Sequence, residues 1–166
     1  MPDDQPRDPL SLDAQLCFAV YAASRAITGL YRDLLAELGL TYPQYLVMLV
    51  LWERGPVPVK ELGAALHLDS GTLSPLLRRL EAAGLVSRER SGSDERVVHA
   101  ALTGRGSAMR ERAERIPEQV LCATGLGTAD ARALHALLDR VTSSLSADAP
   151  PEGASACQPP PQEDRA

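Results

Sequence analysis

Cys17 is the residue of this 166-residue chain whose type and surroundings first raise a question of chemistry. It lies in a stretch with helical periodicity, one turn before Tyr21. A cysteine inside a helix is most often a small buried hydrophobe. Asp13 at i−4 opposes a thiolate, and no Lys, Arg or His lies at i±3 or i±4. A stabilised thiolate would therefore need donors from elsewhere in the fold, or a helix terminus.

A second set of candidate residues lies in 68–80, where small polar side chains open an expected helix and paired arginines follow. Such a helix start can enter the major groove of DNA, and its free amides favour a phosphate. Pro75 lacks a backbone donor, so we expect irregular first turns. We expect one of Arg78 and Arg79 to reach DNA and the other to pair with Glu81 or another acid. An ordinary capped amphipathic helix is the alternative. The candidate contacts are Ser70, Gly71, Thr72, Ser74, Pro75 and Arg78.

Arginines also flank the loop of an expected β-hairpin formed by residues 85–90 and 96–102. An arginine at such a tip can enter the minor groove, where the potential is most negative. Asp94 stands two residues before Arg96 and could hold its guanidinium by a bidentate pair. The alternative is a solvated hairpin with a surface ion pair, which contributes little to stability. The candidate DNA contacts of the hairpin are Arg88, Arg90, Asp94 and Arg96.

The elements that must position these residues are mainly helical. Apolar residues recur at helical spacing, and Gly39, Thr41, Asp69 and Thr103 provide helix ends and caps. We expect helices over residues 10–38, 42–54, 59–66, 70–83, 104–122 and 129–145. A helix–turn–helix followed by a hairpin predicts a mainly α fold, a winged helix–turn–helix with long N- and C-terminal dimerisation helices and a small β-hairpin wing.

This order predicts one winged-helix domain between two tails. The long helices have apolar faces that so small a domain cannot bury completely. Pairing of two chains about a two-fold axis would bury them. The tails are polar and proline-bearing, so we expect them to be disordered. The expected parts are the tail 1–9, the domain 10–145, the dimerisation helices 10–40 and 104–145, the DNA-binding lobe 42–103 with wing 85–102, and the tail 146–166.

The net charge of −5 at first disfavours nucleic acid, but its distribution does not. Residues 1–16 and 147–166 each sum to −3, which leaves +1 for 17–146. Residues 78–115 hold nine arginines against six acids. No apolar run approaches the roughly 20 residues of a membrane span, and no signal segment opens the chain. We expect a cytoplasmic protein with no membrane contact, and three cysteines do not suggest a structural disulfide framework.

Three segments resemble the MarR-type winged-helix repressors: YPQYLVMLVLWE (42–53), LDSGTLSPLLRRLEAAGLVSR (68–88) and SDERVVHAALT (93–103). More narrowly, LCFAVYAASRAITGLY (16–31), TYPQY (41–45) and DSGTLSP (69–75) resemble the OhrR branch, which senses organic hydroperoxides. The likeness covers about residues 10–145. It implies a homodimer that binds an inverted-repeat operator in double-stranded DNA, with one recognition helix and one wing per half-site.

The resemblance also implies roles for two cysteines and two tyrosines. In that branch the reactive cysteine stands at the position of Cys17, and hydroxyls at the positions of Tyr31 and Tyr42 bond to it. Cys17 and Tyr31 are 14 residues apart, about 21 Å along one helix, so an interacting Tyr31 would come from a partner chain. Cys122 matches the resolving cysteine of the two-cysteine subgroup, supplied by the other subunit. The alternatives are an inert helix-end Cys122 and core tyrosines with satisfied hydroxyls; Cys157 is assigned no role.

These features predict a redox-sensing transcriptional repressor that binds operator DNA as a reduced homodimer. Oxidation of Cys17 by an organic hydroperoxide, followed by an intersubunit disulfide with Cys122, would release it. One alternative is a repressor of the same fold controlled by a phenolic or other small effector, with Cys17 inert. A thiol peroxidase is a further alternative, but such an enzyme is expected to have a strand-rich thioredoxin-like pattern, which this sequence lacks. We therefore expect no enzyme and no cofactor. The histidines share no metal-ligand spacing; they are His67, His99 and His135.

Overall fold

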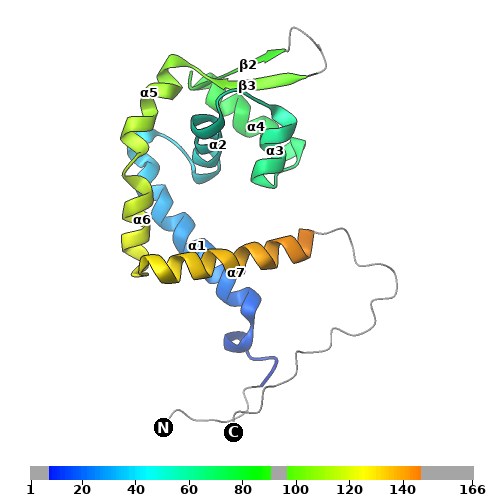
Figure 1. Cartoon of the computed structure of the whole chain (residues 1–166), viewed down its shortest axis with the longest axis vertical. Helices are drawn as coiled ribbons and strands as arrows, with labels where there is room; N and C mark the ends of the chain where they lie inside the picture. The colour runs from blue at the N-terminus through cyan, green and yellow to red at the C-terminus, as the bar shows by residue number, and fades with distance from the viewer. Residues whose placement is uncertain (1–7, 91–96, 147–166) are drawn as a thin grey trace, which may run out of the picture. The chain divides into compact units, whose positions relative to one another are not determined.

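The computed structural model describes residues 8–90 and 97–146 (Figure 1). The elements in chain order are η1 (Leu12–Ala14), α1 (Leu16–Leu35), η2 (Ala36–Leu38), α2 (Tyr42–Arg54), β1 (Val57–Pro58), α3 (Val59–Leu66), α4 (Ser70–Ala82), β2 (Val86–Arg90), β3 (Val98–Leu102), α5 (Gly104–Ala113), α6 (Ile116–Thr124) and α7 (Thr128–Ser146). They form two compact units, one ending at Ala123 and the other beginning at Thr124. The mainly α fold with a small wing is confirmed.

The first long helix begins later than its apolar periodicity predicts. Residues 12–14 form the 3-10 turn η1, and Gln15 is extended, with φ −84° and ψ 113°, so α1 starts at Leu16. At the other end Gly39 adopts φ 66°, a left-handed conformation that glycine takes without strain, and it ends the helical stretch as expected. The late start places Cys17 in the first turn of α1.

Helix α2 is the central helix of the core. Thr41 and Gln44 form a capping box, in which the Thr41 N–H donates to Gln44 Oε1 at 2.8 Å, and Pro43 lies in the first turn. Its buried residues are Gln44, Tyr45, Val47, Met48, Val50 and Leu51. Within the described ranges no single helix is long and apolar enough to cross a membrane, and Leu16–Leu38 with Tyr42–Arg54 pass that test only as a pair bent by 68°.

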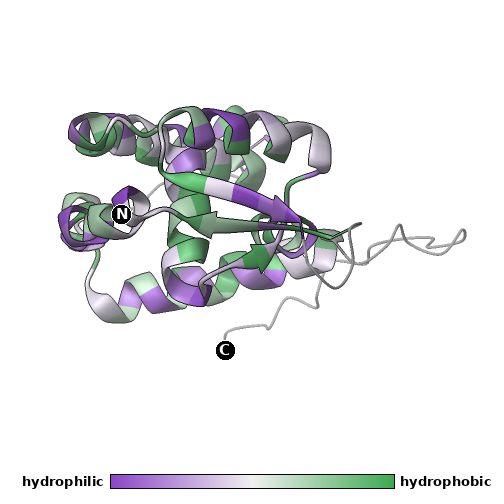
Figure 2. Ribbon diagram, turned by 90° about the horizontal axis from the view of Figure 1, so that it is seen from above, coloured by the Kyte–Doolittle hydropathy of each residue, from purple (hydrophilic) through white to green (hydrophobic). Residues whose placement is uncertain are grey.

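The wing belongs to a three-stranded antiparallel sheet in the order β1-β3-β2. Val86 to Arg90 of β2 pair in register with Leu102 to Val98 of β3. The two-residue strand β1 pairs Val57 with Ala100, and we did not predict it because so short a strand carries no periodicity. Figure 2 shows β2 changing from hydrophobic at its start to hydrophilic toward the loop. The expected contacts Asp94 and Arg96 lie outside the described residues.

The prediction of one helix from residue 104 to about 122 is wrong, because the chain breaks between α5 and α6. Pro117, the second residue of α6, cannot donate to the carbonyl of Ala113, and its ring crowds that carbonyl. Thr103 does cap α5: its Oγ1 accepts from the Gly106 N–H at 3.0 Å and donates to the Gly84 carbonyl at 2.7 Å.

Long apolar side chains remain exposed on α1 and on α7, as the sequence leads us to expect of helices that need a partner. Those of α1 lie mostly in its first half, away from the core cluster that Leu35 and Leu38 join. The exposed residues are Leu16, Phe18, Val20, Tyr21 and Ile27 on α1, and Leu134, Leu137, Leu138, Val141 and Leu145 on α7.

Candidate functional site

Helix α4 presents its polar start to solvent. Asp69 caps it by accepting from the Thr72 N–H at 2.8 Å, and the Thr72 hydroxyl donates to the same carboxylate at 3.2 Å. These hydrogen bonds lower the pKa of Asp69. The Ser74 hydroxyl donates to the Ser70 carbonyl at 2.7 Å, so Thr72 and Ser74 must rotate before they can donate to a phosphate. Ser70 and Gly71 are exposed.

The later part of α4 differs from two expectations. The helix runs unbroken through Pro75, and Leu73, Leu77 and Leu80 anchor its inner face in the core. Arg78 and Arg79 are exposed and form no ion pair with any residue in the described part of the chain.

Glu81 pairs instead with Arg88 of β2, at 2.6 Å between Oε2 and Nη2. Both side chains are about one-third exposed, and the carboxylate raises the pKa of Arg88. This ion pair joins the end of α4 to the base of the wing. Arg88 therefore braces the wing in this structure, whereas Arg90 is exposed toward the loop.

Cys17 is a free, exposed thiol in the first turn of α1. Backbone amides of a first turn point out of the helix and favour a negative charge nearby. Tyr31 lies 14 residues later on the same continuous helix, so the two side chains are about 21 Å apart along the axis.

Two tyrosines at the far end of α1 do come together. Tyr31 of α1 stacks on Tyr42, the first residue of α2, with 4.2 Å between ring centroids. Burial, with the neighbouring Tyr42 and Tyr45 hydroxyls, raises the pKa of Tyr31 to about 12, and burial also raises the pKa of Tyr42. Both hydroxyls therefore remain protonated at neutral pH and can serve as hydrogen-bond donors.

Tyr45 is a third member of this cluster, and the sequence interpretation did not single it out. Its ring lies 5.7 Å from that of Tyr31 and 6.1 Å from that of Trp52. The spacing Tyr42–Tyr45, one helical turn, was the available signal, because residues i and i+3 share a helix face. Trp52 in turn donates from Nε1 to the Gly106 carbonyl at 3.0 Å, which ties the cluster to α5.

Cys122 is an exposed, free thiol in α6, which begins at Ile116. The structure therefore leaves both described cysteines accessible. Cys157, to which no role was assigned, lies outside the described residues. Among the side chains that the structure describes, no group of three His, Cys, Asp or Glu residues could hold a metal ion.

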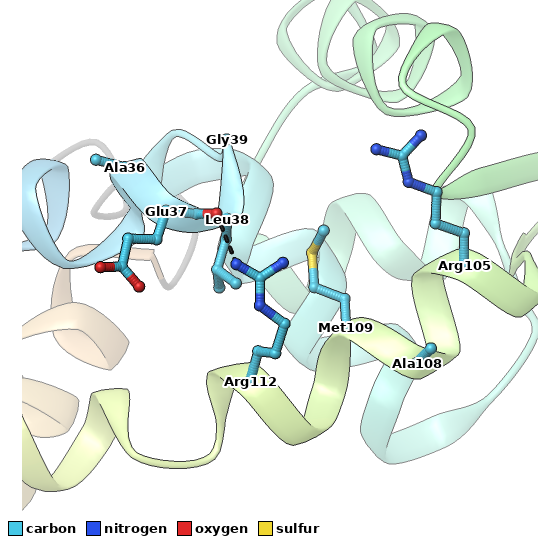
Figure 3. Close-up of a pocket in the computed structure, with 8 residues that line it drawn as sticks. All are labelled: Ala36, Glu37, Leu38, Gly39, Arg105, Ala108, Met109 and Arg112. Atoms are coloured by element: carbon cyan, nitrogen blue, oxygen red, sulfur yellow. Dashed lines mark hydrogen bonds between the residues drawn. The ribbon is translucent and has the colours of Figure 1, made fainter.

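A hollow of about 450 Å³ lies between η2 and α5 (Figure 3). Leu38 and Met109 give it an apolar part, and Arg105 and Arg112 add guanidinium groups. Arg112 donates from Nη2 to the Glu37 carbonyl at 2.8 Å, so this arginine already links the two sides of the hollow.

The helix–turn–helix of α3 and α4, the sheet-borne wing and the exposed start of α4 define a winged helix–turn–helix regulator as the class of protein. The family described as transcriptional regulator SarA/Rot matches residues 29–112. The chain belongs to this family of MarR-type winged-helix transcriptional regulators.

Two similar proteins are named as transcriptional regulators. The HTH-type transcriptional regulator TtmR of Methylorubrum extorquens (strain PA1) is 54% identical over 136 residues, which cover 82% of this chain and 68% of TtmR. The organic hydroperoxide resistance transcriptional regulator of Bacillus subtilis (strain 168) is 49% identical over 114 residues, which cover 69% of this chain and 78% of that protein.

A solved structure with a similar fold is that of reduced AbfR bound to DNA, 36% identical, with a TM-score of 0.68 over 81% of this chain and 93% of AbfR. AbfR is a protein of Staphylococcus epidermidis. Its disulfide-formed structure gives a TM-score of 0.58 over 81% of this chain and 89% of AbfR.

Proposed function

We propose that this chain is a redox-sensing transcriptional repressor of the cytoplasm, which binds operator DNA as a reduced homodimer and leaves it when an organic hydroperoxide oxidises Cys17. The observation that carries the proposal is the separation of Cys17 from the Tyr31–Tyr42 pair by about 21 Å along α1. One chain thus holds an exposed thiol at one end of the helix and a pair of hydroxyl donors at the other. A second α1 running antiparallel would bring each thiol to the partner's tyrosines.

The exposed apolar side chains of α1 and α7 support such pairing, because a two-fold dimer would cover them. The similarity to an organic hydroperoxide resistance regulator and to a DNA-bound AbfR supports the oxidant and the nucleic-acid partner. An inverted-repeat operator follows from two-fold symmetry, with one α4 and one wing per half-site.

The proposed chemistry has two balanced steps. The Cys17 thiolate attacks the outer peroxide oxygen; an S–O bond forms, the O–O bond breaks, and the alkoxide takes a proton and leaves as an alcohol. The sulfenic acid then condenses with the thiol of the partner's Cys122, forming an S–S bond and releasing water. The sulfurs must come within about 2 Å and the Cα atoms within about 7 Å.

Forming that disulfide would move α1 and α6, and with them the spacing of the two recognition helices. Half-sites on DNA are fixed about one helical turn apart, so a changed spacing lowers affinity. The DNA contacts that we propose are the exposed start of α4 and the wing arginines. They comprise Ser70, Gly71, Thr72, Ser74, Pro75, Arg78, Arg90 and, beyond the described residues, Asp94 and Arg96, with Arg88 bracing the wing.

A mixed dimer tests the two-chain site. One subunit carries Cys17→Ser, and the other carries Tyr31→Phe with Tyr42→Phe. If the thiol uses the partner's tyrosines, this dimer retains one complete site, and its thiol is oxidised by cumene hydroperoxide at the wild-type rate. Both parent homodimers should be slow or inert. A mixed dimer as slow as the tyrosine variant would mean that each thiol uses its own chain, and would refute the arrangement.

Cys122 is tested separately by non-reducing electrophoresis of the oxidised protein. Wild type should run as a covalent dimer, and Cys122→Ser should not, while Cys157→Ser should behave like wild type. A covalent dimer that still forms in Cys122→Ser would exclude Cys122 as the resolving cysteine.

The hollow between η2 and α5 favours a second candidate, a repressor controlled by a small apolar carboxylate rather than by oxidation. Its guanidiniums and apolar residues suit such a ligand. Operator release by benzoate or salicylate that persists in Cys17→Ser, without any response to hydroperoxide in wild type, would favour this candidate over the redox switch.

A further inference from the structure

The Tyr45 hydroxyl is a buried polar group that takes no part in the two steps proposed for Cys17 and Cys122. The residue is 1% exposed, and its hydroxyl has no hydrogen-bond partner in the described part of the chain. A buried donor without an acceptor destabilises a fold. Phenylalanine would fill the same space without that cost. We therefore expect the Tyr45 hydroxyl to have an acceptor in the working dimer that the single chain does not provide.

The neighbours of Tyr45 indicate where that acceptor lies. The Tyr31 ring is 5.7 Å away, Tyr42 precedes it by one turn of α2, and Tyr31 and Tyr42 stack on each other. Burial and the adjacent Tyr42 hydroxyl raise the pKa of Tyr45, so it is a protonated donor at neutral pH. Three phenols thus gather where α1 meets α2, two of them half-buried at the surface and one behind them.

We propose that Tyr45 is a positioning residue of the redox site, whose hydroxyl donates to the oxygen of Tyr31 or Tyr42 when these two donate to the partner's Cys17. This rests on the proposed function. A phenol that gives its hydrogen to a thiolate still has lone pairs free to accept. A second hydroxyl that donates to this phenol polarises it, and so strengthens the hydrogen bond from the phenol to the negatively charged sulfur. Tyr45 would act through its neighbours, without touching sulfur or peroxide.

Tyr45→Phe tests the inference because it removes one oxygen and keeps the ring. In the full-length homodimer we expect cumene hydroperoxide to oxidise Cys17 about 10-fold more slowly, equivalent to about 1.4 kcal/mol in the barrier. The pH at which this rate is half-maximal should rise. The operator affinity of the reduced protein should equal that of wild type.

Two further variants separate this role from packing. Tyr42→Phe, which removes a proposed direct donor, should slow oxidation at least as much as Tyr45→Phe. Met48→Leu alters the buried core one turn beyond Tyr45 without touching a hydroxyl, and it should leave the rate unchanged. A wild-type rate in Tyr45→Phe, or a slow rate in Met48→Leu as well, would overturn the inference while leaving the redox switch standing. A wild-type protein whose Cys17 resists oxidation would instead refute the proposed function itself.

Discussion

Gly106 lies in the first turn of α5, where this helix packs against Leu85 at the start of the wing. Replacing Gly106 by alanine should strain this contact. A Cβ at this position would stand 2.0 Å from the Leu85 carbonyl oxygen and 3.0 Å from its carbon. Ordinary contacts lie above about 3.4 Å, so the backbone must move by more than 1 Å. The Leu85 carbonyl also accepts from the Thr103 N–H at 3.0 Å, and the Gly106 carbonyl accepts from Trp52, so this contact is held on both sides.

The cost can be estimated from these contacts. Overpacking against backbone that cannot rotate away destabilises by about 3 kcal/mol. Alanine recovers about 1 kcal/mol over glycine in a helix. The net loss of about 2 kcal/mol corresponds to a fall in melting temperature of roughly 4–8 °C for a chain of this size.

Gly104→Ala is the matched control, because Gly104 lies on the same helix and a Cβ there would meet no neighbouring atom within 4 Å. Thermal unfolding of the three proteins at one concentration provides the assay, since the stability of a dimer depends on concentration. Trp52 is the only tryptophan in the sequence, and its fluorescence should report the loosened contact in Gly106→Ala alone. Equal melting temperatures for Gly106→Ala and Gly104→Ala would refute the proposed close packing of α5 on the wing.

Three further predictions concern other contacts. Thr103→Ala should destabilise by about 1 kcal/mol, because the cap of α5 and the bond to the Gly84 carbonyl are lost, whereas Thr103→Ser should retain most of both; urea unfolding measures this. Arg88→Ala should weaken operator binding with little loss of stability, because the brace to Glu81 is partly exposed; an unchanged affinity in fluorescence anisotropy would count against the brace. Tyr31 has a folded pKa of about 12 against 10.0 as its ordinary value, so the stability it contributes is complete below pH 10 and lost as pH rises toward 12. Tyr31→Phe should remove that part of the alkaline decline, and alkaline unfolding identical to wild type would contradict it.

Most of the fold could be predicted from local signals in the sequence. The caps at Thr41 and Asp69 and the glycine end at Gly39 each act through groups a few residues apart, and each prediction is confirmed. The same locality explains one failure, because apolar spacing continues across residues 114–115 and only Pro117 marks the break. Strand β1 forms because β3 offers it a partner, and no local pattern reports that.

The site was predicted less completely, because its geometry depends on contacts between distant segments. The stacking of Tyr31 on Tyr42 follows from how α1 turns into α2, and the pairing of Arg88 with Glu81 from how β2 lies beside α4. We expected Glu81 to pair with a neighbour on its own helix, but the arginine across the turn reaches it instead. Tyr45 carries no sequence signal stronger than its spacing from Tyr42, and its unpartnered hydroxyl is visible only once the core is assembled.

The most direct test of the redox switch is operator binding by reduced and oxidised protein, with and without Cys17. Fluorescence anisotropy of an operator duplex at fixed salt should show tight binding by reduced wild type, release on adding cumene hydroperoxide, and recovery with dithiothreitol. Cys17→Ser should bind as tightly and stay bound when the hydroperoxide is added. Release of Cys17→Ser by hydroperoxide, or wild type that stays bound after its Cys17 has been fully converted to the disulfide, would contradict the proposal.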